Sequence, residues 1–263
     1  MRVDVLLETF GTHWPEVLDG ALVAERAGFD GVWVNDHLAG SVQDAPHVLE
    51  CWTVLSALAV TVPRITLGPL VLNVANRDPG TLAVMAATLQ DLSGGRLLLG
   101  LGAGARLGTP YAAEQVALGR VVPAGSERRL TVERTIATLR QVWSGTVPPA
   151  SGFLRPEPVP PIVVAGLGPK MAELAGRAGD GICVPVGSGL GQLVAIARQA
   201  YTSSGRGPGQ LLVTALLSSR PAPARLPVGP AVDRLVVYAA PPFDEALARL
   251  SHIVAGWRAG SLS

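Results

Sequence analysis

Short apolar runs rich in β-branched residues alternate with segments of helical periodicity along almost the whole chain. Repeated strand–helix units require parallel strands, because a helical crossover returns the chain to the same end of the sheet. Glycine and proline separate the units and no linker interrupts them, so we expect one domain over residues 1–263. The expected strands cover residues 3–7, 31–35, 65–72, 96–101, 161–164, 180–184, 211–217 and 233–237.

Eight such units in 263 residues predict an α/β fold of the (β/α)8 or TIM-barrel class. A doubly wound open sheet is the alternative, and it is disfavoured because no glycine-rich turn follows the first strand. In the seventh unit, residues 218–231 (SSRPAPARLPVGPA) contain too many prolines for a full helix, so we expect a loop. Residues 105–160 are expected to form a long excursion, with one helix at 128–143 and a proline-rich tail.

The charge balance gives no indication of a polyanionic or membrane partner. Lysine plus arginine total 21 against 20 for aspartate plus glutamate, and no basic tract occurs. No segment approaches the roughly 20 uninterrupted apolar residues that span a bilayer, and Asp4 and Glu8 interrupt the apolar run at the N-terminus. We therefore expect a cytoplasmic protein that binds neither nucleic acid nor a membrane.

Cysteine and histidine are too few and too scattered for a disulfide framework or a metal site. The chain has two cysteines and four histidines, with no CxxC or HExxH spacing. Cys183 lies between Ile182 and Val184 in an expected strand, so we expect it to be buried and inert.

Polar side chains that follow the expected strands identify a candidate site, because the C-terminal ends of barrel strands carry the chemistry. Asp36 and His37 come directly after the second strand, and we interpret them as a hydrogen-bonding pair with His37 as general acid or base. The alternative is an aspartate that caps a loop beside a solvated histidine. Glu8, near the end of the first strand, is a second acid or base candidate, or else a solvated loop carboxylate.

Glycine-containing segments follow the next strands along the chain. Residues 68–73 (GPLVLN) suggest a bulge or a close approach to a ligand, with Asn73 placed to hydrogen-bond a planar ring; a plain barrel kink is the alternative. Residues 100–104 (GLGAG) can lie flat against a ligand, although a tight turn explains them equally well. Residues 165–169 (AGLGP) and 186–189 (VGSG) predict an anion site built from backbone N–H groups, or ordinary strand-to-helix turns.

Three blocks carry a family resemblance: AERAGFDGVWVNDHL (24–38), RITLGPLVLNVANRDPGTLAVMAATLQDLSGGRLLLGLGAG (64–104) and PPIVVAGLGPKMAELAGRAGDGI (160–182). Together they resemble the luciferase-like monooxygenase superfamily, and more narrowly its F420-dependent oxidoreductase branch, whose members use a deazaflavin coenzyme. The similarity runs from the N-terminus to about Gly189 and is fainter over the last strand and helix.

The resemblance implies a luciferase-like (β/α)8 barrel that binds a flavin or deazaflavin at its C-terminal rim. Asp36 and His37 then lie against the ring system. A non-proline cis peptide near Leu70 and Val71 would press behind the central ring, with Asn73 beside it.

The same similarity implies further contacts with the cofactor. Gly102, Ala103 and Gly104 would contact the ring or the ribityl chain. The tail and phosphate would be held by Ala165, Gly166, Leu167, Gly168, Val186, Gly187 and Ser188. A bulky residue at position 166 is therefore expected to weaken cofactor binding.

The chain also departs from the family pattern. Relatives that act on sugar phosphates carry an acidic residue where this chain has Ala105, and a lysine where it has Ser188, Gly189 and Leu190. A dianionic phosphate without cationic partners binds poorly, so oxidation of a sugar phosphate is not expected. The C-terminal half is shorter than usual. This implies shortened C-terminal insertions and a pocket that is open or completed by another subunit of a homodimer.

The expected function is hydride transfer between coenzyme F420 and a small organic substrate, in the direction that reduces an activated C=C, C=N or C=O bond. His37 is expected to donate the proton that quenches the developing negative charge. Two alternatives stay open. One is an FMN-dependent monooxygenase supplied by a separate flavin reductase, and the other is a catalytically inactive cofactor-binding protein.

Overall fold

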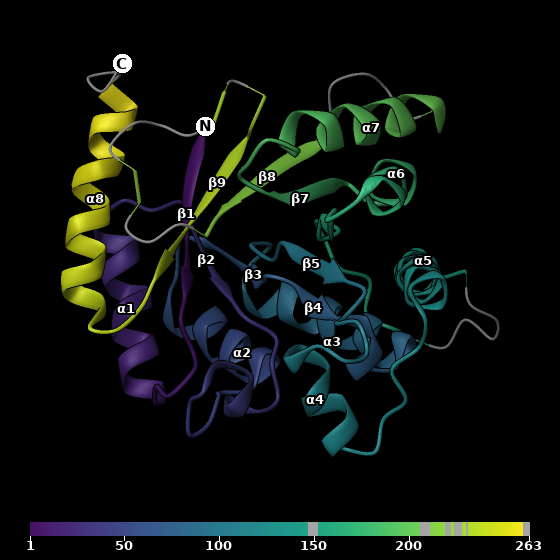
Figure 1. Cartoon of the computed structure of the whole chain (residues 1–263), viewed down its shortest axis with the longest axis horizontal. Helices are drawn as coiled ribbons and strands as arrows, with labels where there is room; N and C mark the ends of the chain where they lie inside the picture. Colours follow the sequence, from purple (N-terminus) through teal and green to yellow (C-terminus); the bar gives the residue numbers. More distant parts are fainter. Residues whose placement is uncertain (147–151, 206–210, 219–221, 224–227, 230, 260–263) are drawn as a thin grey trace.

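Parallel strands form the centre of the molecule (Figure 1). The computed structural model describes residues 1–146, 152–205, 211–218, 222–223, 228–229 and 231–259. The strands are β1 (Arg2–Leu7), β2 (Gly31–Val34), β3 (Thr66–Pro69), β4 (Leu72–Asn73), β5 (Leu99–Gly102), β6 (Ile162–Ala165), β7 (Gly181–Pro185), β8 (Leu212–Leu217) and β9 (Arg234–Ala239). Their order in the sheet is β3-β2-β1-β9-β8-β7-β6-β5-β4, and all neighbouring pairs are parallel.

The sheet curves into a nearly closed barrel. The first and last strands, β1 and β9, pair along their whole length. A bridge between Leu67 and Leu97 links β3 to the chain that enters β5: Leu67 N–H donates to Arg96 O at 3.1 Å, and Leu98 N–H donates to Leu67 O at 2.9 Å. The predicted (β/α)8 barrel is confirmed, and the open doubly wound sheet is wrong.

The third predicted strand, residues 65–72, is divided in the structure. β3 ends at Pro69 and β4 begins at Leu72, and the peptide bond between Leu70 and Val71 is cis. The interruption and the non-proline cis peptide expected at this point are both confirmed. The division explains why the described chain has nine strand segments where the sequence predicts eight.

Helices surround the barrel (Figure 1). They are α1 (Trp14–Arg26), α2 (Cys51–Thr61), α3 (Pro79–Leu92), α4 (Pro110–Ala117), α5 (Gly125–Ser144), α6 (Pro169–Ala178), α7 (Leu190–Ser203) and α8 (Phe243–Ala259), with 3₁₀ turns at Gly40–Gln43 and Val74–Asn76. α3 begins as its sequence predicts: the Asp78 side chain accepts a hydrogen bond from Thr81 N–H at 2.8 Å, and Pro79 occupies the first turn. None of the helices in the described residues has both the length and the apolar character needed to cross a bilayer.

The excursion at residues 105–160 contains a helix that the sequence analysis did not predict. α4 begins at Pro110 directly after Thr109 and has only eight residues, too few to establish a helical period. The helix predicted at 128–143 is confirmed as α5. Residues 147–151 of the proline-rich tail, and residues 219–221, 224–227 and 230 of the predicted loop, lie outside the described residues.

Side chains alternate along the strands and separate two apolar layers. On β1, Val3 and Val5 pack in the cluster that the helices cover, whereas Asp4 and Leu6 face the barrel interior. Asp4 Oδ2 accepts hydrogen bonds from Arg234 Nε at 2.7 Å and from Trp33 Nε1 at 2.9 Å, all within the buried core. This network fills the N-terminal end of the barrel, so the C-terminal end is left for a ligand.

Candidate active site

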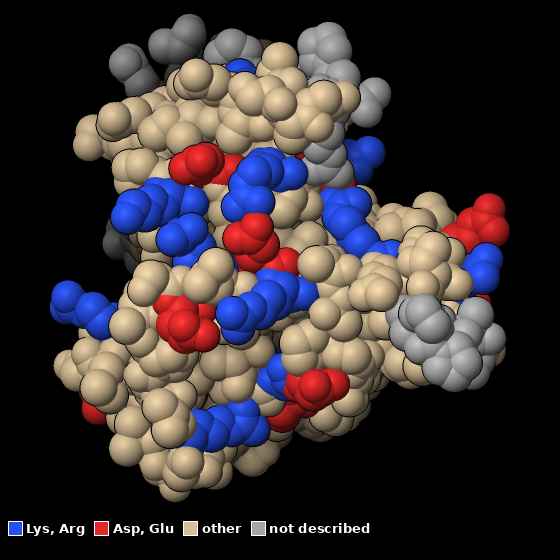
Figure 2. Space-filling model, turned by 90° about the vertical axis from the view of Figure 1, so that its right-hand side faces the viewer, with Lys and Arg blue, Asp and Glu red and all other residues tan. Residues whose placement is uncertain are grey.

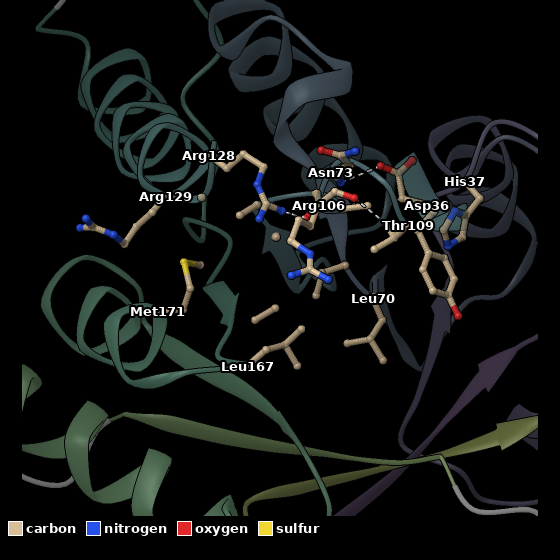
Figure 3. Close-up of a pocket in the computed structure, with 18 of the residues that line it drawn as sticks. Asp36, His37, Leu70, Asn73, Arg106, Thr109, Arg128, Arg129, Leu167 and Met171 are labelled. Carbon is tan, nitrogen blue, oxygen red and sulfur yellow. Dashed lines mark hydrogen bonds between the residues drawn. The ribbon is translucent and has the colours of Figure 1, made fainter. Parts of the chain in front are cut away.

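A cavity of about 720 Å³ opens at the C-terminal ends of β2, β4, β5 and β6 (Figure 3). It is lined by the loops that follow these strands, by α4 and by the first turns of α5 and α6. The structure brings many of the predicted site residues together in its lining: Asp36, His37, Leu70, Val71, Asn73, Gly102, Ala103, Gly104, Ala165 and Leu167.

One wall of the cavity is formed where the break between β3 and β4 packs against the glycines of β5. A Cβ at Gly100 would clash with a backbone oxygen of β3, and a Cβ at Gly102 would lie 2.5 Å from Val71 Cγ2. Gly104 has a φ of +69°, and a Cβ there would clash with Asn73. The protein's own packing therefore requires glycine at these positions. The result is a wall beside Val71 that carries almost no side chains.

The Asp36 carboxylate is fully buried and holds the end of β4. Its Oδ2 accepts a hydrogen bond from Asn73 N–H at 2.7 Å (Figure 3). The two carboxylate oxygens also accept from the Arg77 guanidinium at 2.9 and 3.0 Å, and Arg77 pairs with Glu50 as well. The predicted hydrogen-bonding pair of Asp36 and His37 is wrong, because the Asp36 carboxylate is directed to Arg77 and His37 contacts a different acid.

That acid is Glu114, a residue of α4. His37 Nδ1 lies 3.3 Å from Glu114 Oε1. A carboxylate can only accept, so this contact assigns the proton to Nδ1 and leaves Nε2 as the ring nitrogen available to a ligand. Phe10 and Tyr111 flank the imidazole, with ring centroids 5.2 and 5.9 Å away. The His37 side chain is 21% exposed, so it is held in place and still accessible.

Glu114 also holds the backbone that follows β2. Its Oε2 accepts hydrogen bonds from Leu38 N–H at 2.8 Å and from Ala39 N–H at 3.3 Å. Burial raises the pKa of Glu114, but the hydrogen bonds from His37 and from Leu38 N–H outweigh burial, and the pKa lies below the ordinary value for glutamate. The charged carboxylate thus orients both the imidazole and the loop that carries it.

Sequence reasoning missed several residues of this cavity. Glu114 was missed because its helix was not predicted. The only local signal for α4 is Thr109 followed by Pro110, a start like that of α3. The cations of the lining were missed too, since nothing in their local sequence marks them as facing a cavity: Arg106, Arg128, Arg129 and Lys170.

Other predicted residues are not among the described residues that line the cavity. Glu8 Oε1 accepts from Thr9 N–H at 3.1 Å and from Phe10 N–H at 3.3 Å, and its predicted role as an acid or base stays a prediction. Packing requires glycine at position 166, because a Cβ there would lie 2.7 Å from Ile182 Cδ1, and the predicted contact of Gly166 with a cofactor stays a prediction. The remaining predicted residues outside the lining are Gly168, Val186, Gly187 and Ser188.

The loop after β7 has one backbone donor already in use. Val186 N–H donates to Leu216 O at 2.8 Å, within the sheet. The predicted role of this loop in binding an anion therefore gains no support from the cavity. Among the residues that the structure describes, no group of three or more histidine, cysteine, aspartate or glutamate side chains is arranged to hold a metal ion.

The cavity combines three chemical features. An imidazole backed by a carboxylate lies at one end, a wall of glycines lies in the middle, and arginines lie toward α5 (Figure 3). Such an arrangement can hold a planar ligand, transfer a proton and attract an anionic group.

The family model described as luciferase-like monooxygenase matches residues 1–223. The chain belongs to this family. The resemblance carried by the three sequence blocks is thereby confirmed, and the barrel, the divided third strand and the cavity belong to a luciferase-like protein.

Curated relatives of this luciferase-like chain carry F420-dependent names. It is 34% identical over 200 residues to the F420-dependent glucose-6-phosphate dehydrogenase of Beutenbergia cavernae, covering 72% of this chain and 55% of that protein. The protein of the same name in Microbacterium testaceum is 33% identical over 185 residues, 66% of this chain and 53% of its own length. The F420-dependent hydroxymycolic acid dehydrogenase of Mycobacterium tuberculosis is 34% identical over 172 residues, 61% of this chain and 46% of that protein. The chain thus spans about half the length of these relatives.

Solved structures share the fold. An F420-dependent secondary alcohol dehydrogenase in complex with an F420-acetone adduct aligns with a TM-score of 0.73 and 21% identity, covering 82% of this chain and 68% of that one. The oxygenating constituent of 3,6-diketocamphane monooxygenase from Pseudomonas putida, in complex with FMN, aligns with a TM-score of 0.65 and 19% identity, covering 81% and 66%. Both similarities support the luciferase-like barrel.

Proposed function

We propose that this luciferase-like chain is an enzyme that binds coenzyme F420 and transfers a hydride between it and a small organic substrate. The proposed direction reduces an activated C=C, C=N or C=O bond. The F420-dependent names of relatives that match about two thirds or more of the chain support the choice of cofactor. The observation that carries the proposal is the His37–Glu114 contact, which faces the same cavity as the glycine wall beside Val71.

The residues of the cavity fit a deazaflavin. Val71 and Gly102 belong to a wall from which few side chains project, and such a flat wall suits the face of a planar tricyclic ring. Asn73 Oδ1 accepts from Ala75 N–H at 3.0 Å, so the amide NH₂ is the group that Asn73 can offer to the ring edge. The cavity volume of about 720 Å³ lies within the usual range for small-molecule sites.

When bound, F420 supplies the hydride chemistry, and the protein supplies position and a proton. Negative charge develops on an acceptor as it receives a hydride, and we assign His37 Nε2 as the group that donates a proton to it. The Glu114 carboxylate stabilises the doubly protonated imidazole that makes this donation. After the transfer, the neutral ring keeps its proton on Nδ1, and this N–H donates a hydrogen bond to Glu114.

Cofactor titration tests the proposal. A ligand that binds only the folded protein stabilises it by about 2.7 kcal/mol at a hundredfold excess over the dissociation constant. We expect F420 to raise the free energy of unfolding by this amount and FMN to have no effect. Stabilisation by FMN with none from F420 would overturn the proposal in favour of an FMN-dependent monooxygenase supplied by a separate flavin reductase.

Turnover separates an enzyme from a catalytically inactive cofactor-binding protein. The protein would be incubated with reduced F420 and a panel of enones, imines and ketones, and the absorbance of oxidised F420 would be followed. Oxidation that depends on the added acceptor is the expected result. Cofactor binding without turnover across the panel would support the inactive protein.

A homodimer, a cytoplasmic location and the lack of a nucleic-acid or membrane partner remain predictions. Light scattering on the purified protein would test the homodimer. Cell fractionation and nucleic-acid and vesicle binding would test the others.

A further inference from the structure

The cavity contains cations that no acid compensates. Arg106 and Lys170 line it, and neither side chain has a hydrogen bond or an ion pair with a described residue. Arg128 Nη1 donates to Gly104 O at 2.7 Å, but its Nε is buried and lacks a hydrogen-bond partner among the described residues. A buried N–H without an acceptor is unfavourable, so Arg128 Nε calls for a partner that the described residues do not supply. The Arg106 and Lys170 side chains are exposed and can reach a ligand without first breaking a contact within the described residues.

Arginines on the outside of the same helices are compensated. Arg177 of α6 pairs with Glu133 of α5 at 2.6 Å, and Arg140 of α5 pairs with Asp180 at 2.9 Å. Figure 2 shows basic and acidic side chains interspersed over the face of the molecule at the right-hand side of Figure 1. On α5 and α6, the arginines outside the cavity thus have acidic partners, whereas Arg128 in the cavity has none among the described residues.

The geometry concentrates positive charge in one part of the cavity. Arg106 comes from the loop after β5 and Arg128 from the first turns of α5, and both guanidinium groups are directed into the same region, on the side of Asn73 away from His37 (Figure 3). The acids of the lining are Asp36 and Glu114, which are engaged by Arg77 and by His37. Neither acid neutralises the two arginines.

We infer that Arg106 and Arg128 form a subsite for an anionic group, a carboxylate or a phosphate, of a ligand bound in this cavity. A guanidinium presents planar, paired N–H donors that match the oxygens of both groups. The N-terminus of α5 adds to the attraction, because Gly125 and Ser126 of its first turn also line the cavity. The anion can come from the substrate or from the acidic tail of the cofactor, and in either case its identity rests on the proposed function.

This subsite provides cationic partners for a phosphate that the sequence does not predict. The absence of a lysine near Ser188 predicts a phosphate without cationic partners, but the loop after β5 and the start of α5 provide Arg106 and Arg128 instead. Anionic substrates are therefore compatible with the cavity. The acidic residue that relatives acting on sugar phosphates carry at the position of Ala105 is still absent from this chain.

Calorimetry with inorganic phosphate and pyrophosphate tests the subsite without any cofactor, so its outcome is independent of the proposed function. We expect Arg106→Gln to weaken phosphate binding about tenfold or more, and Arg106→Lys to retain part of the affinity. Arg134→Gln is the control, because Arg134 is exposed on α5, the helix that carries Arg128, and pairs with Glu127 at 3.6 Å. Absence of phosphate binding by the wild type, or equal affinity in Arg106→Gln, would overturn the subsite.

Two further measurements identify the source of the anion. If the cofactor tail is the ligand, Arg106→Gln weakens binding of F420 but not of its ribityl deazaflavin core, which lacks the phosphate and the acidic tail. If the substrate is the ligand, Arg106→Gln leaves both cofactor affinities unchanged and raises KM for a carboxylate-bearing acceptor more than for its neutral amide. Either pattern supports the subsite, and an unchanged response of all four ligands would contradict it.

Discussion

Glu114 Oε1 lies 3.3 Å from His37 Nδ1, and this contact joins positions 77 residues apart in the chain. The second carboxylate oxygen of Glu114 accepts from Leu38 N–H at 2.8 Å. One buried acid therefore orients the imidazole and the loop after β2 at the same time. The contact fixes the His37 ring in one orientation, as the proposed proton transfer requires.

Replacing either member of this contact should lower turnover more than cofactor affinity. We expect His37→Ala to lower kcat by about 100-fold or more, since general acid catalysis commonly contributes that much. Glu114→Gln should lower kcat by about tenfold, because the neutral amide no longer stabilises the charged ring. Steady-state kinetics and F420 titration of each variant would measure both effects.

Glu127→Gln is a control for that pair, because Glu127 is exposed on α5 and should not affect turnover. An unchanged kcat in His37→Ala would exclude His37 as the proton donor. If His37→Ala lowered cofactor affinity as much as kcat, His37 would be assigned to cofactor binding.

Acid should destabilise the wild-type protein partly through Glu114. Burial raises its pKa, but hydrogen bonds from His37 and Leu38 N–H lower it further, so the folded-state pKa is below the unfolded one. Such a group contributes stability above the unfolded pKa, and this contribution is lost as the pH falls through the folded pKa. The difference in free energy of unfolding between wild type and Glu114→Gln should therefore shrink as the pH falls from about 6 to about 3.

Urea denaturation across this pH range would measure the difference. The pKa of Glu50 is also lowered, despite burial, by hydrogen bonds from Thr53 and Trp52, but Glu50 is present in both proteins and its effect cancels. A difference that stays constant with pH would contradict the assignment to Glu114.

Removing Asp36 should destabilise the fold. The variant Asp36→Ala leaves the largely buried Arg77 guanidinium with Glu50 alone and leaves Asn73 N–H without its acceptor. We expect the free energy of unfolding to fall by about 3 kcal/mol, the lower end of the range for breaking a buried ion pair. Urea denaturation would measure it, with Glu245→Ala as the control. That exposed glutamate pairs only with Arg249 within its own helix, and its loss should cost less than about 1 kcal/mol.

A larger side chain at position 166 should lower the stability of the fold and leave ligand binding unchanged. A Cβ there lies 2.7 Å from Ile182 Cδ1 and 3.5 Å from Val184 Cγ1, both in the core. Gly166→Leu should therefore lower the free energy of unfolding by about 1–3 kcal/mol, as overpacking does. Gly187→Ala is the matched control, since nothing lies within 4 Å of its added Cβ, and its effect should stay within about 0.5 kcal/mol. If Gly166→Leu kept full stability and bound F420 more weakly, the result would support the contact between Gly166 and the cofactor that the sequence predicts.

Neither cysteine should react in the folded protein. Burial raises the pKa of Cys183 to about 12 and that of Cys51 well above its usual range, so the reactive thiolate is scarce at pH 8. Mass spectrometry after incubation with iodoacetamide should find both thiols unmodified in buffer and both alkylated in denaturing urea. Alkylation of Cys183 in buffer would show that β7 is accessible from the cavity.

Much of the fold follows from local patterns along the chain. The strand–helix alternation predicts the barrel, Asp78 with Pro79 predicts the start of α3, and the family resemblance places the cis peptide between Leu70 and Val71. These signals are readable because each depends on residues close together in sequence. α4 escaped prediction because eight residues are too few to show a helical period.

The sequence by itself determined the type of fold, the family and the rim of the barrel at which the cavity opens, since strand ends and glycine turns are local features. Only the tertiary structure decided which side chains meet there. It paired Asp36 with Arg77 and His37 with Glu114, and it brought Arg106 and Arg128 into the lining of one cavity. Such contacts depend on how distant helices pack and on the direction of each side chain, and residue spacing along one chain carries neither.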